Sequence, residues 1–293
     1  NNLFTLCHLI YTDTFYMKRK WIRWVSWILL TPIILFVILM VLLYVPPVQN
    51  LLRREVTAYA SKATGMQIQV ERIDLRFPLN LLVRGVEVIQ QPDTLLSLES
   101  LNVRVQAWPL IKGKVEVDEV TLSRVAVNSA DLMEGMNIKG VLGRFFLQSH
   151  GVDLSNELAV INQVELSDTH VQLLMNDTTT TPKDTTASAP INWKVALHQL
   201  KLKNVSFSMQ LPADSMRMAA HIGEAAIDDA QADLKNQYYD LKKFLLSGTS
   251  VSYDTGTAQP AEGFDASHIA VRDIRIALDS LLYKGRDMNA VIR

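Results

Sequence analysis

Residues 117–127 read VDEVTLSRVAV, and this stretch decides the fold. Val120 and Leu122 stand two apart before the polar pair Ser123-Arg124, and Val125 and Val127 stand two apart after it. Alternation of this kind predicts a β-strand with one apolar and one polar face. A polar pair between two alternating runs suits a bulge or a bend that keeps the same face apolar on both sides of the interruption.

The same pattern occurs at five further places, about 25 to 45 residues apart, which indicates an irregular repeat. The other polar pairs are Glu71-Arg72, Ser167-Asp168, Lys203-Asn204, Asp228-Asp229 and Arg272-Asp273. Further strands are predicted over residues 81–89, 95–105 and 244–253, with a single helical turn at 108–111 and a helix over 138–148. The Thr-rich stretch 176–190 predicts a surface loop.

A sheet with one apolar face must cover that face or use it. Alternation alone favours a sandwich or a barrel, which would cover it. The irregular repeats favour instead an elongated array, as does an end inside an alternating segment, SLLYKGRDMNAVIR. We therefore predict a mainly β fold with an elongated, curved, open sheet over residues 66–293, truncated at its C-terminal end. The concave apolar face of such a sheet is a trough suited to acyl chains.

Residues 25–45 form an uncharged apolar run, long enough to cross the hydrocarbon core of a bilayer as a helix. Lys18, Arg19, Lys20 and Arg23 precede the run, whereas only Arg53 and Arg54 follow it closely, so the positive-inside bias places the N-terminus in the cytoplasm. A cleaved signal peptide or a buried core helix fits less well, because the run is long and has no polar face. The expected anchor includes Val25, Leu30, Pro32, Phe36, Leu39, Leu43 and Val45.

The regions that flank this anchor divide the chain further. Residues 1–16 read as a disordered upstream extension, residues 17–46 as the basic flank and transmembrane helix, and residues 47–65 as a short amphipathic helix that caps the sheet and stops at Gly65. The only cysteine, Cys7, lies in the extension, so the remainder has no disulfide framework and no thiolate site.

Motifs for catalysis are absent from the sequence: there is no nucleophile elbow, phosphate-binding loop or zinc-binding His-Glu-x-x-His. The histidines stand singly, and Asp228-Asp229 is better explained as part of a bulge than as an acid-base pair. A net charge of −1 gives no footprint for nucleic acid. We expect no enzyme activity, no cofactor and no metal site.

The region from Met17 to Val127 resembles the start of proteins of the AsmA and TamB group. The resemblance is carried by the single apolar helix, the helix ending in Gly65, the Phe77-Pro78-Leu79 corner, the Arg84-Gly85-Val86 segment and the WPLIKGK turn. Within the group, the chain is most similar to TamB-like proteins, the inner-membrane component of the translocation and assembly module.

The resemblance implies a Gram-negative inner-membrane protein with its bulk in the periplasm. Its bent sheet would be a hydrophobic β-groove (β-taco-like) for phospholipid transport in outer-membrane biogenesis, as in bridge-like lipid transfer proteins. A possible partner is an Omp85-type outer-membrane barrel protein. The implied groove-lining residues are Ile68, Val70, Ile73, Leu75, Phe77, Val120, Leu122, Val125, Val127, Val164, Leu166, Val171, Leu200, Leu202, Val205, Phe207, Ile269, Val271, Ile274 and Ile276.

Two functions remain open at this point. In a lipid conduit, the apolar face shields acyl chains. In an assembly scaffold, that face is covered, and exposed strand edges recruit another protein by strand addition.

Overall fold

The computed structural model describes residues 31, 34, 41, 45–76, 79–106, 108–109, 116–129, 132, 135–153, 157–176, 192–256, 263–285 and 287–292. The chain divides into two compact units, Asn1–Leu51 and Leu52–Arg293. Of the expected anchor residues, Val25, Leu30, Pro32, Phe36, Leu39 and Leu43 lie outside the described residues, whereas Val45 precedes the first described helix and is exposed. No helix within the described ranges is long and apolar enough to cross a membrane.

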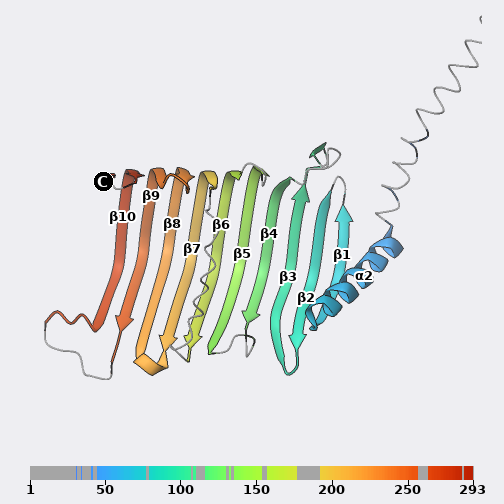
Figure 1. The fold of residues 1–293 in the computed structure, drawn as a ribbon, viewed down its shortest axis with the longest axis horizontal. Coiled ribbons are helices and arrows are strands. Elements are labelled where there is room, and N and C mark those ends of the chain that lie inside the picture. Colours follow the sequence, from blue (N-terminus) through green and yellow to red (C-terminus); the bar gives the residue numbers. More distant parts are fainter. Residues whose placement is uncertain are drawn as a thin grey trace, which may run out of the picture. The chain divides into compact units, whose positions relative to one another are not determined.

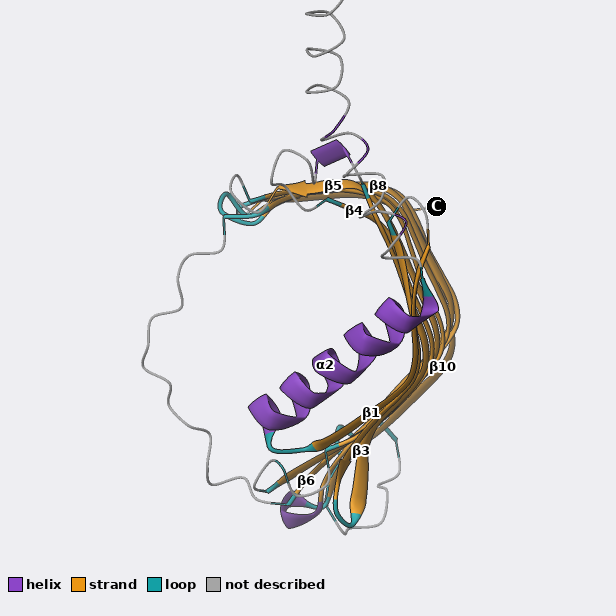
Figure 2. Cartoon of the chain, turned by 90° about the vertical axis from the view of Figure 1, so that its right-hand side faces the viewer, coloured by secondary structure: helices purple, strands orange, loops and turns teal. Residues whose placement is uncertain are grey.

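Helix α2 (Pro46–Thr64) confirms the predicted helix at this position. It stops at Gly65, whose φ of +71° suits glycine and whose N–H donates to the Ser61 carbonyl at 2.9 Å. Residues 52–64 lie beside β1 on the inner side of the bent sheet (Figure 2). Arg53 Nη1 donates to the Glu71 carbonyl oxygen at 2.7 Å. Tyr59 remains 77% exposed, so this helix is held to the sheet by polar contacts more than by an apolar face.

The larger unit forms one open sheet of eleven strands in sequence order (Figure 1). Neighbouring strands are antiparallel except β6 and β7, which are parallel. The strands are β1 (Gln67–Arg76), β2 (Asn80–Gln90), β3 (Asp93–Val105), β4 (Val117–Asn128), β5 (Met136–Asp153), β6 (Leu158–Met175), β7 (Lys194–Leu211), β8 (Met216–Asp233), β9 (Tyr238–Asp254), β10 (His268–Lys284) and β11 (Asp287–Ile292). The open sheet confirms that part of the prediction, and the sandwich or barrel favoured by alternation alone is wrong.

The helix predicted over residues 138–148 is also wrong, because this segment lies within β5. It follows the same pattern as residues 117–127, with Gly143-Arg144 as its interrupting pair. Leu142 pairs with Val125 of β4 and Phe145 pairs with Leu122, so both runs of β5 are in register with the strand beside them.

The polar pairs mark a line along which the sheet bends (Figure 2). Arg124, Asp168, Asn204 and Asp273, the second residues of four predicted pairs, have φ values of +46° to +54°. Aspartate, asparagine and glycine adopt this left-handed conformation more readily than other residues do. Asp229, from a fifth pair, has a φ of +52° and lies at a second such position further along β8. The bend predicted from the polar pairs is therefore confirmed at these strands.

Glycines stand beside the left-handed residues where neighbouring strands come close. A Cβ atom on Gly143 would lie 2.7 Å from Asp168 Cβ and 3.2 Å from the Ser167 carbonyl oxygen. Any side chain at residue 143 would therefore collide with the bend of β6, which explains why this position in β5 is a glycine.

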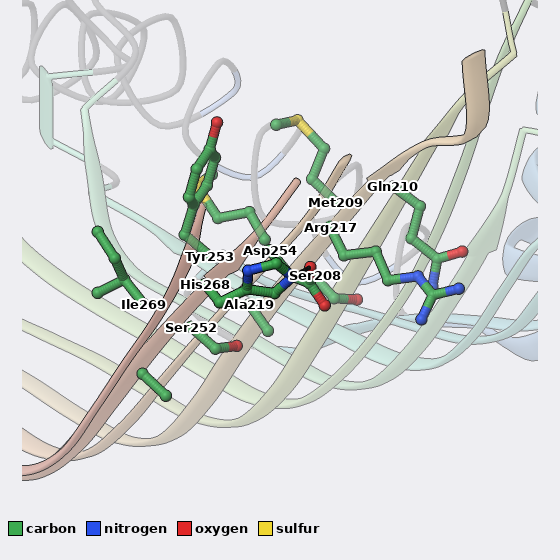
Figure 3. A pocket seen from close by; sticks show the side chains of 12 residues that line it. Ser208, Met209, Gln210, Arg217, Ala219, Ser252, Tyr253, Asp254, His268 and Ile269 are labelled. Atoms are coloured by element: carbon green, nitrogen blue, oxygen red, sulfur yellow. Dashed lines mark ion pairs between the residues drawn. The ribbon is translucent and has the colours of Figure 1, made fainter. Parts of the chain in front are cut away.

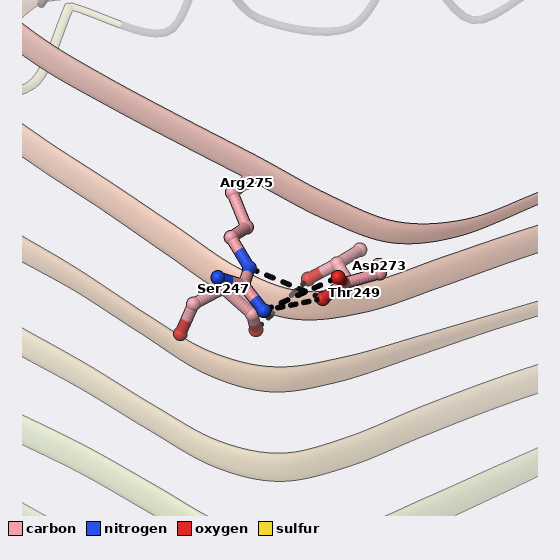
Figure 4. A network of polar contacts seen from close by, with 4 residues as sticks. All are labelled: Ser247, Thr249, Asp273 and Arg275. Atoms are coloured by element: carbon pink, nitrogen blue, oxygen red, sulfur yellow. Dashed lines mark hydrogen bonds and ion pairs between the residues drawn. The ribbon is translucent and has the colours of Figure 1, made fainter.

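Side chains of the bend form polar contacts both between neighbouring strands and within single strands. Asn204 Nδ2 donates to Asp168 Oδ1 at 2.8 Å. Arg275 forms an ion pair with Asp273 at 3.1 Å, and Thr249 Oγ1 donates to the Ser247 carbonyl oxygen at 3.5 Å (Figure 4). The described backbone at the bend is thus supported by local side chains.

Burial distinguishes the two sides of the bend. Ile73, Leu98 and Ala225, which flank it, are only 7–8% exposed, whereas Asp168 and Asn204 at the bend itself are exposed. The polar pairs therefore lie on the outer side and the flanking apolar residues on the inner side. No side chain among the described residues is less than 2% exposed, as expected for a single layer without a covering sheet.

Candidate functional site

The inner face carries two apolar rows that cross the sheet without interruption from β1 to β10. The first row, next to the bend, consists of Ile73, Val83, Leu101, Leu122, Phe145, Leu166, Leu202, Ala225, Leu246 and Ile276. The second consists of Leu75, Leu81, Val103, Val120, Leu147, Val164, Leu200, Ile227, Phe244 and Leu278. With neighbouring strands about 4.8 Å apart, each row is roughly 43 Å long.

Three more rows lie on the other side of the bend. The third row contains Val70, Val86, Leu98, Val125, Leu142, Thr169, Val205 and Ile222, and it continues through Thr249 and Ile274. The fourth contains Ile68, Val88, Leu96, Val127, Gly140, Val171, Phe207, Ala220, Val251 and Val271. The fifth, shorter, contains Ile138, Leu173, Met209, Met218, Tyr253 and Ile269.

The structure brings the predicted groove residues into these five rows. Every one of them within the described residues occupies a row, and Phe77 lies outside the described residues. The sequence analysis missed their partners on β2, β3, β5 and β9, for example Val83, Phe145 and Leu246. Strands 81–89, 95–105 and 244–253 were predicted, but their polar interruptions Arg84-Gly85, Glu99-Ser100 and Ser247-Gly248 were not matched to the repeated pattern.

The rows are accessible. Val271 is 47% exposed and Ile276 39% exposed, and most of the other row residues are half-buried. Tyr253 and Met209 rise on the hollow side of the curved strands (Figure 3). No charged residue stands in either of the first two rows, so a ligand along them would meet apolar side chains throughout.

The outer face, in contrast, is polar and carries ion pairs such as Arg104–Glu119 at 3.1 Å. Lys242 Nζ donates to Asp240 Oδ2 at 2.8 Å, and this hydrogen bond raises the pKa of the lysine. Exposed ion pairs of this kind contribute little to stability, because water and salt screen them. They keep the outer face hydrated more than they stabilise the fold.

The residues considered for chemistry lie at the second bend. His198 Nδ1 is 3.0 Å from Asp229 Oδ1, and the left-handed φ of Asp229 places the Asp228-Asp229 pair at a bend of β8. The bulge expected for this pair is not found, because the register of β8 with β7 and β9 is continuous there. Within the described part of the chain, no group of three or more His, Cys, Asp or Glu residues is arranged to hold a metal ion.

The interpretation of the inner face rests on the geometry of the sheet, because comparison with known proteins identifies no family. No protein-family model matches the chain, and no curated protein matches its sequence.

Proposed function

We propose that the inner face binds lipid acyl chains and that the protein carries phospholipid along it, from the inner membrane toward the outer membrane. The observation that supports this proposal most directly is the pair of unbroken apolar rows across ten strands, accessible on the inner face. Residues of the same kind on adjacent strands would give a sliding chain a similar environment at each step.

The energetics favour this occupant. Burying one methylene group contributes about 0.8 kcal/mol, so an acyl chain lying along the first or second row would be stabilised by many small contacts. Because these contacts are non-directional, the chain can move from strand to strand without breaking hydrogen bonds. The charged head group would stay in water at the rim. We propose no chemical reaction and no cofactor.

The membrane setting of this proposal comes from the sequence. The apolar run 25–45 would anchor the protein in the inner membrane, with its N-terminus in the cytoplasm and its sheet in the periplasm. The groove of the TamB-like proteins that residues 17–127 resemble has the same orientation.

A second candidate function is an assembly scaffold. The sheet is open, and the exposed edge of an open sheet can pair with a strand of another protein. An Omp85-type barrel protein would be the partner on this alternative. It differs from the conduit in needing a strand edge rather than the inner face.

Two neighbouring leucines of β9 test the conduit. Leu246 belongs to the first row, whereas Leu245 pairs with Ala226 and Ala277 on the outer face and is 49% exposed. Aspartate at residue 246 would place a charge among apolar contacts, which strongly disfavours a bound acyl chain. We expect Leu246→Asp to lose most of the phospholipid that co-purifies with the protein, and Leu245→Asp to retain it.

Circular dichroism and the urea midpoint would show that both variants remain folded. Equal phospholipid content in the two folded variants would contradict the conduit. Equal content, together with binding of a partner strand at an edge of the sheet, would favour the scaffold.

A further inference from the structure

A shallow furrow crosses the outer face of β7 to β10, near the rim formed by the turn Pro212–Asp214. Its floor is a row of small residues on adjacent strands, Ser208, Ala219, Ser252 and Ala270. Two hollows of about 320 and 400 Å³ share this row. The floor lies on the face opposite to the apolar rows, because its residues alternate with Met209, Tyr253 and their neighbours along each strand.

Hydrogen-bond donors border the furrow on both long sides. Toward the rim, Arg217 follows the floor, and Gln210 pairs with it in register. Toward the bend, Ser206, His221 and Ser250 occupy one row, and Arg272 lies next to them on β10. The arrangement therefore places two guanidinium groups on opposite sides of a floor that contributes serine hydroxyls.

Several of these donors have no partner. Within the described ranges, neither Arg217 nor Arg272 has a side-chain hydrogen bond or ion pair, and the hydroxyl groups of Ser208, Ser250 and Ser252 have none. Two other arginines of the sheet have ion-pair partners, Arg104 with Glu119 and Arg275 with Asp273.

One neighbouring carboxylate stands opposite a guanidinium group. Asp254 is the only carboxylate among the residues that line the two hollows; it pairs in register with Arg217 and lies 3.3 Å from His268 Nε2. Asp265 also contacts His268, at 2.9 Å. Asp273 forms its ion pair with Arg275, and Glu224 pairs in register with Lys203. The two hollows are thus lined by two guanidinium groups, one carboxylate and several serine hydroxyls.

We propose that this furrow binds a tetrahedral oxyanion of the phosphate class. Guanidinium groups match phosphate oxygens in pairs of hydrogen bonds, and serine hydroxyls complete the shell of donors. The phosphate can be free in solution or belong to a lipid head group that hangs over the rim. The site goes beyond the proposed transfer function, because none of its donors lies on the inner face.

The test uses the full-length chain in dodecyl maltoside micelles and isothermal titration calorimetry. One arm titrates inorganic phosphate, and a second titrates dihexanoyl phosphatidylglycerol as monomers. We expect the double variant Arg217→Gln/Arg272→Gln to bind about 100-fold more weakly than the unaltered chain, at about tenfold for each guanidinium removed. The matched control is Arg84→Gln/Arg275→Gln, which removes two positive charges outside the furrow.

Binding of both probes, with loss only in the Arg217/Arg272 variant, would support the proposal with phosphate itself as the ligand. Binding of phosphatidylglycerol alone, with the same loss, would support it with a head group as the source. No binding of either probe, or equal weakening in the control variant, would overturn it. Leu246→Asp separates this site from the inner face, because it should leave phosphate binding unchanged whether or not the conduit proposal holds.

Discussion

Substitutions at two glycines of β5, which stand three residues apart, test how closely the strands approach at the bend. A Cβ atom on Gly143 would lie 2.7 Å from Asp168 Cβ, a distance at which the backbone of β5 or β6 has to move. On Gly140, the nearest atoms would be the His170 carbonyl oxygen at 3.7 Å and Val171 Cγ2 at 3.9 Å, which are ordinary contacts. The same substitution should therefore have opposite effects at the two positions.

The magnitudes follow from general costs. Overpacking a tight contact costs about 1–3 kcal/mol, whereas replacing glycine by alanine stabilises by about 0.4–1 kcal/mol through the unfolded chain. Gly143→Ala should thus lower the free energy of unfolding by roughly 0.5–2 kcal/mol after this offset. Gly140→Ala should leave it unchanged or raise it by up to about 1 kcal/mol.

Urea unfolding of the full chain, followed by circular dichroism of the sheet, compares the two variants. The midpoint of Gly143→Ala should lie below that of the unaltered chain, and the midpoint of Gly140→Ala at or above it. Equal midpoints for the two variants would refute the close approach of β5 and β6 at Asp168.

Three further predictions concern the bend, the turn after β8 and helix α2. Asn204→Val should lower the free energy of unfolding by about 1–2 kcal/mol, because a β-branched residue disfavours the φ of +53° at this position. Asn204→Gly should change that free energy by less than about 0.5 kcal/mol. Urea unfolding compares the two variants. The Asn236 backbone N–H donates to Asp233 Oδ1 at 3.1 Å, and this hydrogen bond lowers the pKa of the Asp233 carboxyl below its ordinary value of 3.8. The stabilisation that the ionised carboxyl provides is therefore present above pH 3.8 and is lost as the pH falls through the lowered pKa. An NMR titration should therefore give Asp233 a pKa below 3.8, and a value above 3.8 would exclude this hydrogen bond. Arg53→Met removes the hydrogen bond to the Glu71 carbonyl oxygen. Amide hydrogen exchange should become faster in α2 and stay the same in β5 to β9. Unchanged exchange in α2 would show that other contacts hold the helix.

The strands and the bend of the sheet were predictable from the sequence because their signals are local. An apolar residue every second position specifies one face of a strand, and a polar pair that ends in Asp or Asn indicates a left-handed residue. Asp168, Asn204 and Asp273 are all of this kind. The segment around Phe145 was assigned wrongly because Gly143 stands where other strands carry a polar side chain.

The unbroken rows could not be predicted in the same way, because register is a property of strand pairs. Nothing local indicates that Phe145 lies between Leu122 and Leu166. The furrow on the outer face was missed for the same reason. Arg217 and Arg272 are far apart in the sequence and have no motif in common, and only the pairing of β8, β9 and β10 brings them to one floor.

The central claim is that the inner face is open and occupied by acyl chains in the cell. Photocrosslinking tests it most directly, with a photoreactive amino acid at Leu122, Leu166, Leu202 or Val271 on the inner face and at Ser123 or Lys203 on the outer face, followed by mass analysis of the adducts. We predict phospholipid adducts at the four inner positions and none at the two outer ones. Adducts only to protein at the inner positions, or phospholipid adducts equally on both faces, would contradict the claim.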